Sequence, residues 1–140
     1  MTTFKILAAG AVAGIAANGT GYLITGRLFH RFQGMTPGTW RVQESWTQYQ
    51  YATMIRIGAC IAIAFLYARL GPLAPSLAGN SLSRGASFGS ILWAATVLPV
   101  VGEVALFVNW HRGFVLGLLL DWWIVYVLAS VAGAIVAGAA

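Results

Sequence analysis

Four long apolar stretches constrain this chain more than any other feature of its sequence. They cover residues 6–29, 49–70, 86–110 and 114–137. A helix needs about 20 mainly apolar residues to cross the hydrocarbon of a bilayer, and all four stretches reach that length. They are too long and too continuous for barrel strands, which run to about ten residues of alternating character. The sequence therefore predicts an all-α integral membrane protein folded as a four-helix bundle.

The composition excludes the soluble alternatives. Hydrophobic residues make up 59% of the 140 residues and charged residues 8%, against about 45–50% and about 25% in soluble domains. So few charges cannot cover a soluble surface, and so much apolar surface is not typical of a disordered chain. We expect one transmembrane domain over residues 1–140.

The connections between the stretches predict how the spans are paired. Residues 30–46 form a polar linker with a Pro37-Gly38 turn, and residues 71–84 contain another turn at Gly79-Asn80-Ser81. The third connection, at His111-Arg112-Gly113, is very short and predicts that the last two spans are antiparallel. The bundle is therefore expected to consist of two antiparallel hairpins. The polar residues 18–21 interrupt the apolar character of the first span, and Asn18 and Thr20 are expected to form interhelical hydrogen bonds. The alternative is a local break of the helix at these residues.

The basic residues give a weak indication of orientation. One side of the predicted membrane carries four of them, Arg27, Arg31, Arg41 and Arg112, and the other side carries three, Lys5, Arg69 and Arg84. Because cytoplasmic loops carry the excess of Lys and Arg, this count leans toward both termini outside the cytoplasm. A predicted aromatic belt on the more basic side comprises Trp40, Trp46, Tyr49, Tyr51 and Trp110.

The net charge of +5 does not indicate nucleic-acid binding, because the basic residues are scattered and form no recognition motif. The single cysteine, Cys60, excludes an internal disulfide and a CxxC metal motif. His30 and His111 lie at span ends without a ligand spacing, so we expect no metal and no cofactor.

Two pairs of glycines have the spacing of helix-packing motifs. Gly10 and Gly14 lie in the first span, and Gly85 and Gly89 begin the third. Glycine at this spacing lets two helix backbones approach closely in a membrane. These four residues are predicted to lie at helix–helix contacts.

Several short motifs resemble a known family. The second half carries Gly85 to Trp93, Pro99, Asn109, Phe114 to Leu120, Asp121-Trp122 and Ala132 to Ile135, and the first half carries Gly21-Tyr22, Gly26 to Phe29 and Gly34 to Thr36. In these motifs the chain resembles the domain of unknown function 1761 family, which comprises small, mostly bacterial, four-helix membrane proteins. The resemblance implies a bacterial cytoplasmic (inner) membrane protein. It supplies no catalytic residue.

Three charged residues fall inside the predicted spans. Counted from a turn at Arg112, Glu103 and Asp121 are each nine residues away, so the two carboxylates are expected at the same depth, and Arg56 is expected at a comparable depth. A charge inside a span costs at least about 2.5–3.5 kcal/mol. We therefore expect a polar cluster of Arg56, Glu103 and Asp121 within the bundle, which is either a structural ion pair or a binding site or proton relay.

These patterns leave three functions open. The favoured one is a non-enzymatic membrane protein that acts through homo-oligomerisation or as an accessory subunit of a membrane complex, with lipid as its surroundings. The second is a translocator of protons or small solutes through Arg56, Glu103 and Asp121. The third is a membrane enzyme that acts on a lipid or quinone, and only the two carboxylates support this function.

Overall fold

The computed structural model describes residues 3–39, 45–74, 77 and 79–138 of the chain. All the regular secondary structure of these residues is helical, which confirms the all-α prediction. Four helical segments are long and apolar enough to cross a membrane: Thr3–Met35, Trp46–Leu73, Ser81–Phe107 and Arg112–Gly138. Trp40 and Arg41, which belong to the predicted belt and charge count, lie outside the described residues.

The long helices are α1 (Thr3–Gly21), α2 (Trp46–Leu70), α3 (Ser81–Phe107) and α4 (Arg112–Gly138). Shorter segments continue or connect them, namely the π-helix η1 (Tyr22–Phe29) and the 3-10 helices η2 (His30–Met35), η3 (Pro37–Thr39) and η4 (Gly71–Leu73). The polar residues 18–21 do not break the helix, which excludes the alternative of a local break there: α1 is helical up to Gly21 and then continues as the wider turns of η1.

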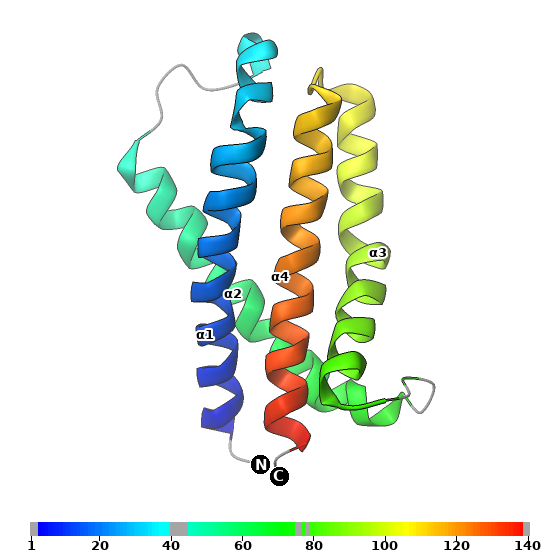
Figure 1. The fold of residues 1–140 in the computed structure, drawn as a ribbon. Coiled ribbons are helices and arrows are strands. Elements are labelled where there is room, and N and C mark those ends of the chain that lie inside the picture. The colour runs from blue at the N-terminus through cyan, green and yellow to red at the C-terminus, as the bar shows by residue number, and fades with distance from the viewer. Residues whose placement is uncertain (1–2, 40–44, 75–76, 78, 139–140) are drawn as a thin grey trace.

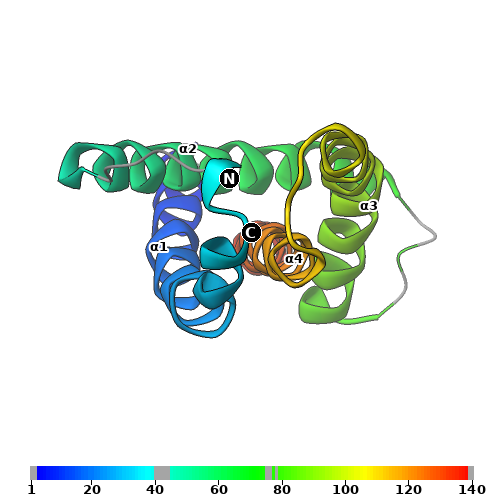
Figure 2. The ribbon, with the colours of Figure 1, turned by 90° about the horizontal axis from the view of Figure 1, so that it is seen from above.

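Helix α4 lies in the middle of the bundle, with α1 on one side and α3 on the other (Figure 1). Helix α3 runs antiparallel to α4, and the start of α1 and the end of α4 lie at the same end of the bundle. Helix α2 crosses the bundle at a steep angle, and its first half extends beyond α1 on the side away from α4 (Figure 2).

The core of the bundle is built mainly from small side chains. Its buried cluster consists of Ala13 and Ala17 of α1, Cys60 and Ile63 of α2, and Val125 and Ala129 of α4. Because lipid tails are as apolar as these residues, close van der Waals packing rather than water exclusion holds membrane helices together. Small side chains allow that close packing.

Gly10 and Gly14 lie at the crossing of α1 and α2. A Cβ atom on Gly10 would lie 2.6 Å from Ile61 Cα, and one on Gly14 would lie 2.8 Å from Ile57 Cα. No side chain fits at such distances from a neighbouring backbone. The two glycines therefore allow the closest approach of α1 to α2.

Gly85 and Gly89 likewise allow the close approach of α3 to α4. A Cβ atom on Gly85 would lie 2.6 Å from Val131 Cα, and one on Gly89 would lie 2.6 Å from the Tyr126 carbonyl oxygen. These contacts also fix the register of the two helices, because they place Gly85 level with Val131 and Gly89 level with Tyr126.

Helix α2 begins with a capping box, although its first half extends away from the bundle. The Gln48 backbone N–H donates to Ser45 Oγ at 3.4 Å, and the Ser45 N–H donates to Gln48 Oε1 at 2.9 Å. The cap satisfies backbone donors that would otherwise be unpaired at a helix start. The start of α2 is therefore stabilised by its own cap.

Candidate functional site

Arg56 of α2 and Asp121 of α4 form a two-pronged ion pair inside the bundle. Arg56 Nη1 donates to Asp121 Oδ1 at 2.8 Å, and Nη2 donates to Oδ2 at 2.7 Å. The aspartate side chain is 1% exposed and the arginine side chain 17%. Parallel hydrogen bonds of this kind are among the strongest polar contacts in proteins and also fix the orientation of both groups. The pair thus ties α2 to α4 at one fixed geometry.

Two further groups attach the first span to this pair. Arg56 Nη1 also donates to the Ala17 carbonyl oxygen of α1 at 3.0 Å, and Thr25 Oγ1 of η1 donates to Asp121 Oδ2 at 3.2 Å. The Arg56 guanidinium lies 5.6 Å from the centre of the Trp122 ring, within cation–π range. One ion pair therefore connects α1, η1, α2 and α4.

Gly21 makes room for the ion pair. A Cβ atom at this position would collide with Arg56 Nη1 and would lie 3.1 Å from Asp121 Oδ1. Gly21 continues the row of buried small residues formed by Gly10, Gly14 and Ala17, which are three or four positions apart and share one helix face. The row of small residues thus extends from the helix crossing to the buried charges.

Glu103 does not join Arg56 and Asp121. It is exposed on α3, and it has no hydrogen bond or ion pair with any residue that the structure describes. Its position on the helix explains this. Val101 is the buried residue of that turn, and a residue two positions further along a helix points about 200° away.

The expectation of equal depth for the two carboxylates is wrong. The register set by Gly85 and Gly89 makes Asp121 level with about Ala94 or Ala95. Glu103 lies eight or nine residues further along α3, or roughly 12–13 Å at 1.5 Å per residue. Helix α3 ends at Phe107, so Glu103 belongs to its last turns near the membrane surface.

A cleft of about 410 Å³ opens beside Arg56, between the α1–η1–η2 segment and the first half of α2. The cleft exists because α2 diverges from α1 beyond the Gly14 crossing. Its lining residues are mainly polar: Asn18, Gly21, Tyr22, Thr25, Gly26, His30, Gln33, Tyr49, Ala52, Thr53 and Arg56. The partly exposed Arg56 lies at its base.

Asn18 and Thr20 make contacts within their own helix and not the interhelical hydrogen bonds expected of them. Asn18 Nδ2 donates to the Gly14 carbonyl and Thr20 Oγ1 donates to the Ala17 carbonyl, both within their own helix. His111 stacks on Phe32 at 4.6 Å, and its Nδ1 accepts the Gly113 N–H at 3.0 Å. Within the described ranges, no three His, Cys, Asp or Glu residues gather as a metal site.

Sequence reasoning missed three contributors to the site: Gly21, Thr25 and the Ala17 carbonyl group. Gly21 could have been found by continuing the spacing from Gly10 through Gly14 and Ala17. Thr25 lies four positions beyond Gly21, where it shares the same face of a helix. No sequence signal marks a backbone carbonyl as an acceptor for a side chain 39 positions away along the chain.

The chain matches no protein-family model, no curated protein and no solved structure. Its resemblance to the domain of unknown function 1761 family therefore stays a prediction.

Proposed function

We propose that this integral membrane protein acts by self-assembly, and that the first half of α2 is the surface that meets a second copy. The observation that carries the proposal is a row of α2 residues that continues past the last contact with α1. The bacterial cytoplasmic membrane is the proposed location, because the family that the chain resembles is mostly bacterial.

The row follows the helix repeat of α2. Ile57 and Ile61 pack against Gly14 and Gly10 of α1, and the same face continues toward the start of α2 through Met54, Gln50 and Trp46. These three residues are exposed, with Trp46 at 76% and Met54 at 68%. The packing face of α2 thus continues beyond the Gly14 crossing, where α2 has diverged from the segment formed by α1 and η1.

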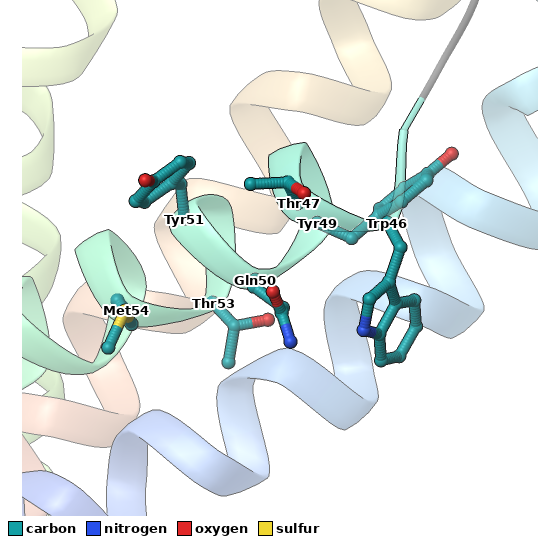
Figure 3. A pocket seen from close by; sticks show the side chains of 7 residues that line it. All are labelled: Trp46, Thr47, Tyr49, Gln50, Tyr51, Thr53 and Met54. Carbon is teal, nitrogen blue, oxygen red and sulfur yellow. The ribbon is translucent and has the colours of Figure 1, made fainter.

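A hollow of about 560 Å³ lies along this part of α2. Figure 3 shows Trp46, Gln50 and Thr53 on one side of the helix and Tyr51 on the other. All the residues that line the hollow belong to α2, and they offer aromatic, amide and hydroxyl groups that an opposing helix can contact.

Chemistry favours a second copy as the occupant. A glutamine amide both donates and accepts, so two copies of Gln50 can pair across a two-fold axis, as can the hydroxyl groups of Thr47 and Thr53. An interface of this type uses the same patch on both partners. Polar side chains of this kind hold transmembrane helices together.

The ion pair supports assembly better than translocation. Both oxygens of Asp121 are bonded, its side chain is 1% exposed, and Glu103 is too far away to exchange a proton with it. A relay needs a second group within reach of the first. We infer that Arg56 and Asp121 hold α2 at the angle that presents its first half outside the bundle.

Disulfide cross-linking in membranes tests the proposal. The background variant is Cys60→Ala, which removes the one native thiol, and a single cysteine is then introduced by Gln50→Cys or, as a control, Leu106→Cys. Leu106 is 82% exposed on α3 and lies outside the row. We expect a covalent dimer with Gln50→Cys under mild oxidation and monomer with Leu106→Cys.

A second measurement, of dimer affinity, distinguishes a second copy from other binding partners. In nanodiscs, Gln50→Leu should weaken the dimer by about threefold to twentyfold, because interhelical hydrogen bonds in membranes contribute about 0.6 to 1.7 kcal/mol each. A monomer at all protein-to-lipid ratios, with no cross-link at Gln50→Cys, would refute self-assembly. A cross-link to a different membrane protein would replace the second copy with that partner.

A further inference from the structure

The polar cleft beside Arg56 has properties that the ion pair does not explain. The cleft lies between segments that cross the membrane, yet eight of its eleven lining residues are polar. In hydrocarbon each polar group needs a partner. The side chains of His30, Gln33 and Thr53 line the cleft and have no hydrogen bond to another described residue. A polar molecule in the cleft would supply the missing partners.

The charged groups around the cleft determine whether an anion or a cation is favoured in it. No carboxylate is among the residues that line it, while the Arg56 guanidinium borders it. Arg27 is exposed in η1 and its Nε donates to the hydroxyl of Tyr22 at 3.1 Å, and Tyr22 is a lining residue. Two cations beside the cleft and no lining carboxylate favour an anion.

Asp121 does not cancel this preference at the cleft. Its oxygens are turned toward Arg56 and Thr25, and it is 1% exposed, whereas Arg56 keeps 17% of its side chain exposed. A molecule in the cleft therefore meets the guanidinium edge and not the carboxylate. The remaining arginine donors and the His30, Gln33 and Thr53 side chains are of the types that bind phosphate oxygens.

We propose that this cleft binds the phosphate-bearing headgroup of an anionic phospholipid. Arg56 lies at the base of the site, and His30 and Gln33 supply donors from η2. A membrane lipid fits better than a soluble phosphate ester, because the cleft opens between membrane-crossing helices and next to Tyr22 and Leu23, which are 58% and 59% exposed. Those apolar surfaces are suited to acyl chains. Basic pockets between membrane helices are a recurring way to bind such headgroups.

The test uses the full-length protein and two lipids of matched chain length, phosphatidylglycerol (anionic) and phosphatidylcholine (neutral). The protein is released from mixed nanodiscs, and the lipid that it retains is measured by native mass spectrometry. We expect retention of phosphatidylglycerol over phosphatidylcholine by about tenfold, and loss of that preference in the double variant His30→Ala/Gln33→Ala. Two hydrogen bonds to a charged group are enough for a change of this size.

Control variants show whether the lipid preference depends on the cleft itself. Arg112→Gln removes an exposed charge at the same end of the bundle, but Arg112 does not line the cleft, so its preference should stay within about twofold of the parent. His30 is exposed and Gln33 half-buried, so the double variant should keep the thermal unfolding of the parent. Neither residue belongs to the α2 row, so failure here leaves the self-assembly test unaffected.

Three results would overturn the proposal. One is equal retention of the two lipids by the parent protein. Another is an unchanged preference in His30→Ala/Gln33→Ala while Arg112→Gln loses it, which would indicate a diffuse charge effect. The third is displacement of the retained lipid by glycerol 3-phosphate at equal concentration, which would assign the cleft to a soluble phosphate ester.

Discussion

At the scale of single residues, the Arg56–Asp121 pair allows the strongest energetic prediction. Truncating Arg56 leaves a carboxylate that is 1% exposed and keeps only the Thr25 hydroxyl as a partner. Breaking a buried pair by removing one partner costs about 3–5 kcal/mol. We expect Arg56→Leu to lower the free energy of unfolding in detergent by about that amount.

Replacing Asp121 in place of Arg56 should lower the free energy of unfolding by less. In Asp121→Leu, Arg56 keeps the Ala17 carbonyl and its access to the cleft, so it is still partly solvated. The double variant should recover part of the loss, because an apolar pair removes both buried charges. Glu103→Gln is the control and should stay within about 0.5 kcal/mol of the parent. If Glu103→Gln lost as much free energy of unfolding as Arg56→Leu, the prediction that Glu103 joins Arg56 and Asp121 would be supported.

Gly21 gives a second prediction at this scale, with a matched control in the same helix. In Gly21→Ala the new methyl group collides with the Arg56 guanidinium, so the ion pair has to shift. We expect a loss of about 1–3 kcal/mol, which is typical of overpacking. Around Gly19 a Cβ atom would meet nothing within 4 Å, and Gly19→Ala should raise stability by up to about 1 kcal/mol through helix propensity. Equal thermal unfolding temperatures for the two variants would contradict the contact.

Only part of this site could be predicted from the sequence. Arg56 and Asp121 stand out because charges are costly in apolar stretches, and depth counting suffices to bring them near each other. Glu103 was misplaced because the count assumed a turn at Arg112, whereas α3 ends at Phe107 and residues 108–111 form the connection. Which face of α3 carries Glu103 depends on the contacts of Gly85 and Gly89, and a residue count does not supply it.

At the scale of helices, the glycine pairs are the feature most open to test. Gly89 approaches the Tyr126 carbonyl so closely that a Cβ atom would lie 2.6 Å from it, and backbone cannot move aside as a flexible side chain does. We therefore expect Gly89→Ala to separate α3 from α4 and to cost about 1–3 kcal/mol. Gly102→Ala in the same helix, where a Cβ atom would meet nothing, should be neutral or stabilising. Unfolding in detergent, followed by tryptophan fluorescence, compares the two variants.

The positions of the helices along the chain could be predicted, but the inclination of α2 could not. The four predicted spans overlap the four helical segments that are long and apolar enough to cross a membrane, because the thickness of the hydrocarbon dictates the length and apolar content of a span. The predicted third span extends three residues beyond the end of α3 at Phe107. Inclination depends on how neighbouring helices pack, which hydropathy does not encode. In this bundle it depends on the Gly14 crossing and on the Arg56–Asp121 pair. The cleft and the unpartnered row of α2 both result from that inclination, so neither could be read from the sequence.

At the scale of the whole molecule, the fold determines which segments share a side of the membrane. The start of α1, the connection between α2 and α3 and the end of α4 lie at one end of the bundle, and the connection between α3 and α4 lies at the other (Figure 1). In a Cys60→Ala background, we expect Thr3→Cys, Leu73→Cys and Gly138→Cys to react with a membrane-impermeant thiol reagent from the same side. Asn109→Cys should react only from the opposite side.

The charge count adds a direction to this arrangement. Among the described residues the two ends carry three basic residues each, Arg27, Arg31 and Arg112 at one end and Lys5, Arg69 and Arg84 at the other. The count made from the sequence adds Arg41, which lies outside the described residues, to the first group. On that count the positive-inside rule predicts that the end with Arg27, Arg31 and Arg112 faces the cytoplasm. In intact bacteria the reagent should therefore label Thr3→Cys and Gly138→Cys and leave Asn109→Cys unlabelled until the membrane is opened. The reversed pattern would contradict the orientation alone. Labelling of Thr3→Cys and Gly138→Cys from opposite sides would contradict four spans, because an even number of crossings brings both ends of a chain to one side.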